Sequence, residues 1–361
     1  MKPPVDFFIL YHMELKKQLI VILGPTASGK SELAIFLAKQ IKKHQGDSYK
    51  EAEIISADSR QVYKYLDVGT NKVPGTWQTI GGFASDKKSE AKPPIVFIYK
   101  NIPHYCIDFV HPRKTYTVAE YKTCAEKAIK EISRRGNIPL LVGGTGLYIQ
   151  AVTDGMLLPE VPPNVALRKK LEKKPTEQLF AILKKLDPRR ALTIDAKNPR
   201  RLIRALEIVL FTQKSVPKLK IKSEFETLFI GIKKSDTELK HAIEQRSKKQ
   251  ITGLLKEAEL LLKIHVPKKR IRELGFEYRL GLEFLTRKKS LPTSLLQREE
   301  FPHLEKRGAG RFNDLIMDLS KENWRYTRRQ MTWFKRNKQI QWIQKNDKAL
   351  YIMKKFLGEN K

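Results

Sequence analysis

Cysteine is scarce in this sequence, and its scarcity excludes two classes of protein. Among 361 residues only Cys106 and Cys124 are cysteines. Two thiols cannot make the disulfide framework of a small secreted domain, and no group of cysteine and histidine has the spacing of a zinc site. We therefore expect a protein of a reducing compartment, the cytoplasm.

Long apolar runs are absent as well. No segment approaches the roughly 18 consecutive apolar residues that a membrane-spanning helix needs. The apolar run Phe7–Leu10 is too short for the core of a secretory signal, and Glu14, Lys16 and Lys17 follow it. We expect neither a spanning segment nor a membrane partner.

Acidic residues are few beside the basic ones. The chain has 71 Lys and Arg against 39 Asp and Glu, so its net charge is +32. A compact chain with this excess repels itself, and such an excess usually serves a polyanionic partner. Nucleic acid is the first candidate and an anionic membrane surface the second, while free use of lysine in an AT-rich genome is a third explanation. The apolar share of 41% is sufficient for a globular core.

One segment has the pattern of a phosphate-binding loop. The β-prone run Leu19–Leu23 precedes it, and apolar residues at three- and four-residue steps predict a helix after it. The loop consists of Gly24, Pro25, Thr26, Ala27, Ser28, Gly29, Lys30 and Ser31. Backbone N–H groups of such a loop surround a di- or triphosphate, the lysine neutralises it, and the Ser31 hydroxyl can bind Mg²⁺. The pattern predicts a phosphate site without specifying a nucleotide.

Two further apolar runs predict strands that end in polar residues. Glu53–Ala57 ends at Asp58, Ile138–Val142 ends in GGTG with Thr145, and a helix is expected between them over Val118–Ser133. Apolar strands that alternate with helices predict an α/β fold, a P-loop NTPase-like parallel sheet flanked by helices, with its ligands at the carboxyl ends of the strands. An aspartate there serves as magnesium ligand, general base or turn cap, and the position alone leaves the three open.

The middle of the chain changes character after residue 158, where prolines interrupt the α/β pattern. Helical, basic segments follow at Val165–Lys173, Thr176–Leu186 and Pro199–Phe211, and a strand at Glu226–Ile232 then resumes the sheet. We expect a P-loop core in 1–157, an inserted, mostly helical domain in 158–223, and a return strand with C-terminal helices in 224–361. Residues 75–94, rich in Gly, Ser and Lys, predict a long exposed loop, and Asn323–Arg336 predicts a final helix.

Three arginines share the third of these helical segments. Arg200 and Arg204 lie on one face at a spacing of four residues, and Arg201 lies one position around. A solvated helix face and a phosphate-binding face both have this pattern.

Six strings of the sequence together resemble the tRNA dimethylallyltransferases, also called isopentenylpyrophosphate:tRNA transferases. They are GPTASGKSELA from Gly24, ISADSRQVYK from Ile55, PHYCID from Pro103, PLLVGGTGLYI from Pro139, NPRRLIRALEI from Asn198 and RRQMTWFKR from Arg328. The resemblance runs in the family's order from about Leu19 to Trp342. Two departures stand out: Tyr65 stands where the family commonly has Gly, and TNKVP from Thr70 replaces a GTAKP-like string.

The resemblance implies a prenyl transfer. The P-loop and Arg246 would hold the diphosphate of dimethylallyl diphosphate, with Mg²⁺ near Ser31. The acceptor would be the N6 amine of the adenosine on the 3′ side of the anticodon, in tRNAs that read codons beginning with U. Asp58 would act as the catalytic base, and Thr145 would stabilise the leaving group. The enzyme would be a monomer. The adenine would leave the anticodon stack to reach them.

The resemblance also implies which residues contact tRNA, with the inserted helical domain closing on the anticodon stem. The family positions are Asp58, Ser59, Arg60, Gln61, Thr145, Arg168, Arg200, Arg201, Leu202, Ile203, Arg204, Arg272, Glu273, Leu274, Gly275, Phe276 and Glu277.

Two other functions fit the P-loop and Asp58. One is a P-loop kinase of a small metabolite, and the other is an RNA-binding ATPase that leaves the RNA unchanged.

Overall fold

The computed structural model describes residues 17–42, 51–79, 95–217, 223–286 and 304–358. The apolar run Phe7–Leu10 and most of the predicted loop 75–94 lie outside these ranges. Within them no helix is both long and apolar enough to span a membrane.

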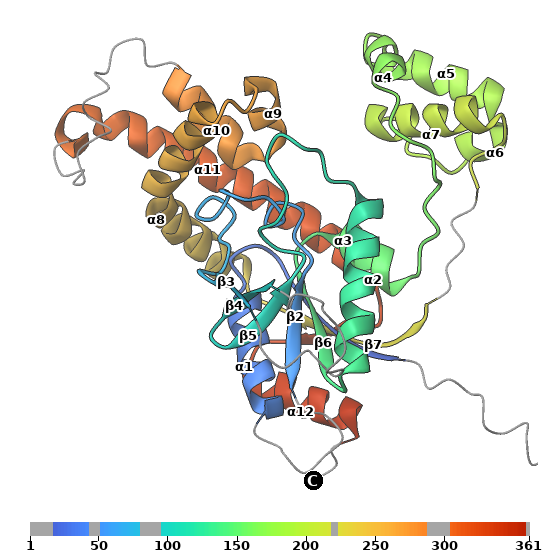
Figure 1. Cartoon of the computed structure of the whole chain (residues 1–361). Coiled ribbons are helices and arrows are strands. Elements are labelled where there is room, and N and C mark those ends of the chain that lie inside the picture. Colours follow the sequence, from blue (N-terminus) through green and yellow to red (C-terminus); the bar gives the residue numbers. More distant parts are fainter. Residues whose placement is uncertain (1–16, 43–50, 80–94, 218–222, 287–303, 359–361) are drawn as a thin grey trace, which may run out of the picture. The chain divides into compact units, whose positions relative to one another are not determined.

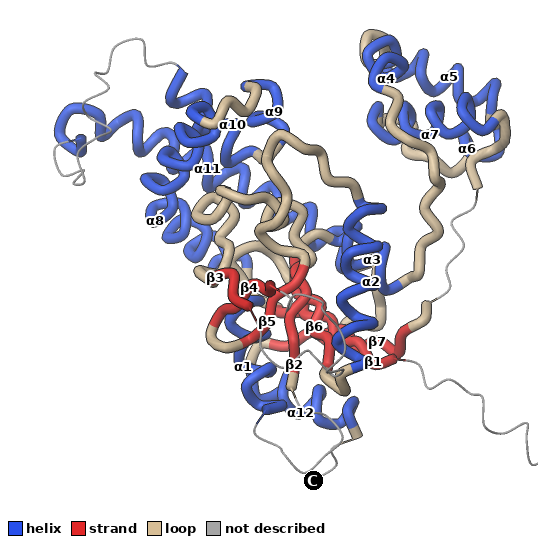
Figure 2. The backbone as a smooth tube through the Cα atoms, in the orientation of Figure 1, coloured by secondary structure: helices blue, strands red, loops and turns tan. Residues whose placement is uncertain are grey.

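The described strands form one sheet in the order β3-β4-β5-β2-β6-β1-β7-β8 (Figures 1 and 2). In this order, the strands from β5 to β8 (β5, β2, β6, β1, β7 and β8) all pair in parallel. The pairs β3 with β4 and β4 with β5 are antiparallel. The predicted α/β fold with a mainly parallel sheet is confirmed. The strands are β1 (Lys17–Leu23), β2 (Ala52–Ser56), β3 (Thr76–Thr79), β4 (Ile95–Tyr99), β5 (Ile102–Tyr105), β6 (Ile138–Gly143), β7 (Phe225–Ile232) and β8 (Gln341–Ile343).

Helices cover both faces of this sheet, which explains why its strands are apolar throughout. Successive side chains of a strand point to opposite faces. Ile20 and Ile22 therefore pack with α1 (Lys30–Lys42) and α12 (Asn346–Leu357). Leu19 and Val21 pack on the other face with α2 (Val118–Arg134) and α3 (Gly146–Thr153) (Figure 1).

A helical bundle adjoins the loop that follows β2. It contains α8 (Asp236–Lys263), α9 (Lys268–Glu273), α10 (Phe276–Thr286) and α11 (Leu304–Phe334). Its core includes Leu254, Tyr278 and Leu319 together with Val62 and Leu66 of the loop, and all five side chains are fully buried. The bundle thus fixes the segment immediately after Asp58.

Residues 154–222 form a second compact unit with a core of its own. Its helices are α4 (Val165–Leu171), α5 (Thr176–Leu186), α6 (Pro188–Ala191) and α7 (Pro199–Thr212). Leu179, Leu183 and Leu206 are among its buried residues. The sequence had suggested an inserted domain over 158–223.

Several elements differ from the sequence predictions. Residues 76–79, predicted as part of a loop, form the edge strand β3, which pairs with β4 although all four of its side chains are exposed. The predicted final helix Asn323–Arg336 is the second half of the longer α11, and β8 and α12 follow it. Pairing with a neighbouring strand, rather than an apolar pattern, fixes such short edge strands.

Candidate active site

The P-loop turns from β1 into the N-terminus of α1. Gly29 has φ +93° and Ala27 φ +59°, and the helix begins at Lys30. Left-handed residues before a helix gather successive backbone N–H groups into a concavity that binds anions. The hydroxyl of Ser28 is buried and has no hydrogen-bond partner within the described structure. It is therefore a donor available to a phosphate oxygen.

Two cations stand beside this loop. Lys30 donates from Nζ to the carbonyl oxygen of Pro25 at 2.7 Å, and burial lowers the pKa of its ammonium to about 8. Arg246 reaches across from α8 and donates from Nη1 to the hydroxyl of Thr26 at 2.7 Å. Burial lowers the pKa of Arg246 as well. Two desolvated cations next to the N-terminus of a helix make an electropositive site for a multiply charged anion.

The ends of β2 and β6 are joined by backbone hydrogen bonds. The N–H of Ala57 donates to Val142 at 2.7 Å, and the N–H of Thr145 donates back to Ala57 at 3.1 Å. A Cβ atom on Gly143 would lie 2.2 Å from the carbonyl oxygen of Ala57, so only glycine permits this approach. The two predicted strand ends therefore meet.

This junction places Asp58 beside the hydroxyl of Thr145. The N–H of Ser59 donates to Thr145 Oγ1 at 3.1 Å, and the N–H of Arg60 donates to Asp58 Oδ1 at 2.8 Å. The second contact is an Asx turn, so Asp58 does cap a turn. A carboxylate can accept such a bond and still accept a proton from a ligand, because it has two oxygens.

A cavity of about 800 Å³ connects the P-loop to Asp58. Glu277 and Tyr326 lie in its wall, where burial raises the pKa of Glu277 to about 7 and that of Tyr326 to about 12. A hydrogen bond joins the side chains of Tyr326 and Thr145. The cavity thus has a basic end at the P-loop and a mixed acidic and phenolic wall around Asp58.

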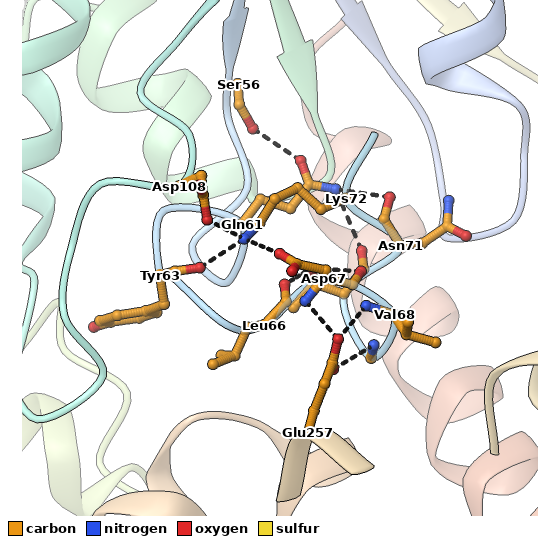
Figure 3. Close-up of polar contacts among 12 residues, drawn as sticks. Ser56, Gln61, Tyr63, Leu66, Asp67, Val68, Asn71, Lys72, Asp108 and Glu257 are labelled. Carbon is orange, nitrogen blue, oxygen red and sulfur yellow. Dashed lines mark hydrogen bonds and ion pairs between the residues drawn. The ribbon is translucent and has the colours of Figure 1, made fainter. Parts of the chain in front are cut away.

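A polar network fixes the loop after Asp58, and Figure 3 shows its members. Glu257 of α8 accepts the N–H groups of Asp67, Val68 and Gly69 at 2.9, 2.5 and 3.0 Å. It also accepts the hydroxyl of Tyr278 at 2.7 Å. One carboxylate therefore satisfies three consecutive backbone donors and ties the loop to the bundle.

Lys72 closes the same loop from its other side. Its Nζ contacts Asp67 Oδ1 at 2.5 Å and Asp108 Oδ1 at 2.8 Å, and its side chain is only 2% exposed (Figure 3). Gln61 donates to the carbonyl oxygens of Thr70 and Asn71 at 3.3 and 3.2 Å. Gln61, Thr70 and Asn71 line the cavity, so this network shapes the cavity wall.

Tyr65 lies within this loop and explains one departure from the family pattern. Its φ is +67°, in the left-handed region that favours glycine. The chain keeps the turn with a tyrosine, at a cost of about 1 kcal/mol in backbone strain.

The tRNA-contact residues predicted near the cavity fall into two groups. Ser59, Arg60, Gln61 and the segment 275–277 line the cavity. Arg272 and Glu273 are exposed, whereas Leu274 is fully buried and its side chain packs in the bundle.

The residues predicted in the helical unit also divide. Arg168 makes a bidentate pair with the buried Glu207, both contacts at 2.7 Å, and Arg204 contacts the same carboxylate at 3.3 Å. Arg200 and Arg201 are exposed. Leu202 and Ile203, which resemblance placed at tRNA, have side chains 0% and 7% exposed in the core of the unit. Two arginines thus stabilise the unit and two face solvent.

Sequence reasoning did not single out Glu257 or Lys72. Glu257 binds a loop 188 to 190 residues away in the chain, which no local pattern indicates, and Lys72 stands in the TNKVP string, which was noted only as a departure from the family. Tyr326 falls in the predicted final helix, but its hydrogen bond with Thr145 could not be inferred from that pattern.

The sheet order and the cavity define a P-loop protein with an electropositive cavity at the carboxyl ends of its strands, next to an aspartate. A model of the IPP transferase family matches residues 61–337. A tRNA dimethylallyltransferase from Halothermothrix orenii is 34% identical over 329 residues, which cover 88% of this chain and 85% of that protein. One from a Cyanothece species is 38% identical over 256 residues, 71% of this chain and 75% of that protein. The chain belongs to the IPP transferase family.

Solved structures agree in fold. The tRNA isopentenylpyrophosphate transferase of Bacillus halodurans is 28% identical, with a TM-score of 0.58 and coverage of 95% of this chain and 96% of that one. A eukaryotic dimethylallyltransferase acting on tRNA is 23% identical, with a TM-score of 0.63 and coverage of 96% and 80%. The second likeness concerns the fold alone.

Proposed function

We propose that this chain transfers a dimethylallyl group from dimethylallyl diphosphate to the N6 amine of the adenosine that follows the anticodon in tRNAs reading U-initial codons. The observation that carries the proposal is a cavity that runs from the P-loop to Asp58, where the N–H of the neighbouring Ser59 donates to the hydroxyl of Thr145. Family membership supports the reaction class. It disfavours a small-molecule kinase or an RNA-binding ATPase, which share only the P-loop.

The donor would bind with its diphosphate at the P-loop. The loop N–H groups, the Ser28 hydroxyl, Lys30 and Arg246 stabilise the negative charge that grows as diphosphate leaves the allylic carbon. The leaving group takes both electrons of the C–O bond, and the allylic carbon becomes cationic. A P-loop thus serves here as a leaving-group site.

The acceptor adenine would leave the anticodon stack and enter from the side of Asp58. Its N6 amine is a weak nucleophile because the lone pair is delocalised into the purine ring. Asp58 orients this amine and takes the proton that it loses as the new C–N bond forms. The hydroxyl of Thr145 accepts the N–H of Ser59, the residue after Asp58, and is hydrogen-bonded to Tyr326, and both of these neighbours line the cavity.

A magnesium ion would bind here largely through the substrate. In the described part of the chain, no group of three His, Cys, Asp or Glu residues is placed to hold a metal. Mg²⁺ commonly keeps several waters and binds substrate phosphates with one or two protein oxygens. Ser31, at the first turn of α1, lines the cavity and can supply such an oxygen. The ion would neutralise charge on the diphosphate.

The remaining features concern where and with what the chain works. The charge of +32 fits a tRNA partner, with the exposed Arg200 and Arg201 available to backbone phosphates. We place the reaction in the cytoplasm and expect a monomer.

The test is a product analysis. Purified protein is incubated with Mg²⁺, unmodified tRNA and dimethylallyl diphosphate, and the RNA is digested and its nucleosides weighed. We expect an adenosine heavier by one isopentenyl unit, formed about 10²- to 10⁴-fold more slowly when D58N replaces the wild-type protein. Unaltered tRNA in this incubation, together with ATP hydrolysis in a parallel incubation with ATP and tRNA, would support an ATPase and refute the proposal.

A further inference from the structure

Helix α11 places a buried glutamine between the two loops that carry the proposed chemistry. Gln330 is 6% exposed. Its Oε1 accepts the backbone N–H of Thr26 at 2.9 Å, and its Nε2 donates to the carbonyl oxygen of Gly144 at 2.9 Å. One side-chain amide therefore joins the P-loop to the loop that carries Thr145.

The two loops belong to neighbouring strands but separate where the strands end. Pairing of β1 with β6 ends at Leu23 and Gly143. Beyond that point Gln330 occupies the space between the loops, since a Cβ atom on Gly144 would lie 2.3 Å from its Nε2. The glycine at position 144 is thus explained by the amide that packs against it.

Helix α11 also contacts the loop that carries Thr145 through residues before and after Gln330. Tyr326 forms its hydrogen bond with Thr145, and a Cβ atom on Gly146 would lie 2.4 Å from Cδ1 of Trp333. Positions 326, 330 and 333 share one helix face. Three consecutive residues, two in the loop after β6 and the first of α3, are therefore contacted by three residues of one helix.

We propose that Gln330 is a positioning residue that fixes the separation between the prenyl donor on the P-loop and the acceptor adenine at Asp58 and Thr145. This inference rests on the proposed function. Gln330 also lines the cavity, but the role proposed here is exerted through its bonds to Thr26 and Gly144. Transfer between two bound molecules requires close alignment, and a displacement of about 1 Å can lower the rate about 100-fold.

The contacts require an amide in particular. One end must accept from an N–H group and the other must donate to a C=O group, which a glutamine does and an ionised glutamate does not. In Q330E a carboxylate oxygen would oppose the carbonyl oxygen of Gly144. A protonated glutamate can donate instead, so the activity of Q330E relative to wild type should recover as the pH falls.

The experiment compares Q330M, Q330E and a control on the same helix. Methionine matches glutamine in volume and removes both strong hydrogen bonds. The control is T327V, because Thr327 is 1% exposed and its hydroxyl is buried without a hydrogen-bond partner in the described structure. We expect Q330M to lose about 10- to 100-fold in kcat, with KM for tRNA and for dimethylallyl diphosphate changed less than about threefold. T327V should remain near wild type.

Two results would overturn the inference. One is a folded Q330M with kcat within about threefold of wild type or with its whole defect in KM. The other is a Q330E to wild-type activity ratio that stays constant from about pH 8 down to about pH 4.5, near the ordinary pKa of a glutamic acid. The second readout decides the question even if Q330M fails to fold. A wild-type protein that transfers no prenyl group in this assay would refute the proposed function instead.

Discussion

Lys30 allows a test of the phosphate site that does not depend on catalysis. Its pKa is lowered to about 8, chiefly by burial and further by Arg246, while Asp58 and Glu32 act in the opposite direction. A bound diphosphate favours the charged ammonium and raises this pKa. Anion binding is therefore linked to proton uptake.

The expected magnitude follows from that pKa. While the pKa in the complex stays well above the pH, the dissociation constant scales as 1 + 10^(pH − 8). This factor rises from about 1.1 at pH 7 to about 11 at pH 9, so affinity for dimethylallyl diphosphate should fall about tenfold. At pH 8 about half a proton should be taken up for each ligand bound. The terminal phosphate has a pKa of about 6 and stays ionised over this range.

Isothermal titration calorimetry measures both quantities, the second from titrations in buffers of different ionisation enthalpy. K30R stays charged throughout and should lose the pH dependence, even if it binds more weakly. Glu277, with its pKa raised to about 7, lines the same cavity, so E277Q separates its contribution from that of Lys30. A wild-type dissociation constant that does not change between pH 7 and pH 9, with no proton uptake at pH 8, would refute the reasoning.

The other predictions concern the base, the buried acids and the charge. D58N should lower kcat by about 10²- to 10⁴-fold with tRNA affinity unchanged, as single-turnover and binding assays would show; near-normal turnover would exclude Asp58 as the base. Because its raised pKa makes the ionised Glu277 unfavourable in the folded state, stability falls between pH 4.5 and about 7, and E277Q should raise the unfolding free energy at pH 8 by at most about 3 kcal/mol. Equal stabilities of the two proteins at pH 8 would contradict this. E207A leaves two arginines without their buried partner and should destabilise the helical unit by about 3 kcal/mol, measured by hydrogen exchange in 154–222. If about six phosphates are neutralised, log K for tRNA should fall with log salt at a slope of about −5, and a slope near zero would mean that the charge has no such partner.

The central sheet could be predicted from sequence because its information is local. Strand β1 is a continuous apolar run that ends in a glycine-rich loop, and β6 repeats the pattern. The edge strands were missed for the opposite reason. Strand β3 is four residues long with no buried side chain, and only its register with β4 defines it.

The same distinction applies to the site. Parallel strands bring Asp58 and Thr145 to one edge of the sheet, so their proximity follows from topology. The contacts of Arg168 and Arg204 could not be inferred, because the buried Glu207 that holds them shows no pattern of its own in the sequence. Contacts between residues that lie far apart in the chain could not be predicted from local sequence patterns.

These distant partners also bear on why a common loop serves an uncommon reaction. A P-loop by itself binds phosphate, and kinases and ATPases share it. Here its Thr26 is held from positions 220 and 304 residues away in the chain, by Arg246 of α8 and Gln330 of α11. Arg246 adds positive charge, and Gln330 ties the loop to the one beside Asp58. The C-terminal half of the chain is therefore part of the phosphate site, and it couples the predicted donor site to the predicted acceptor site.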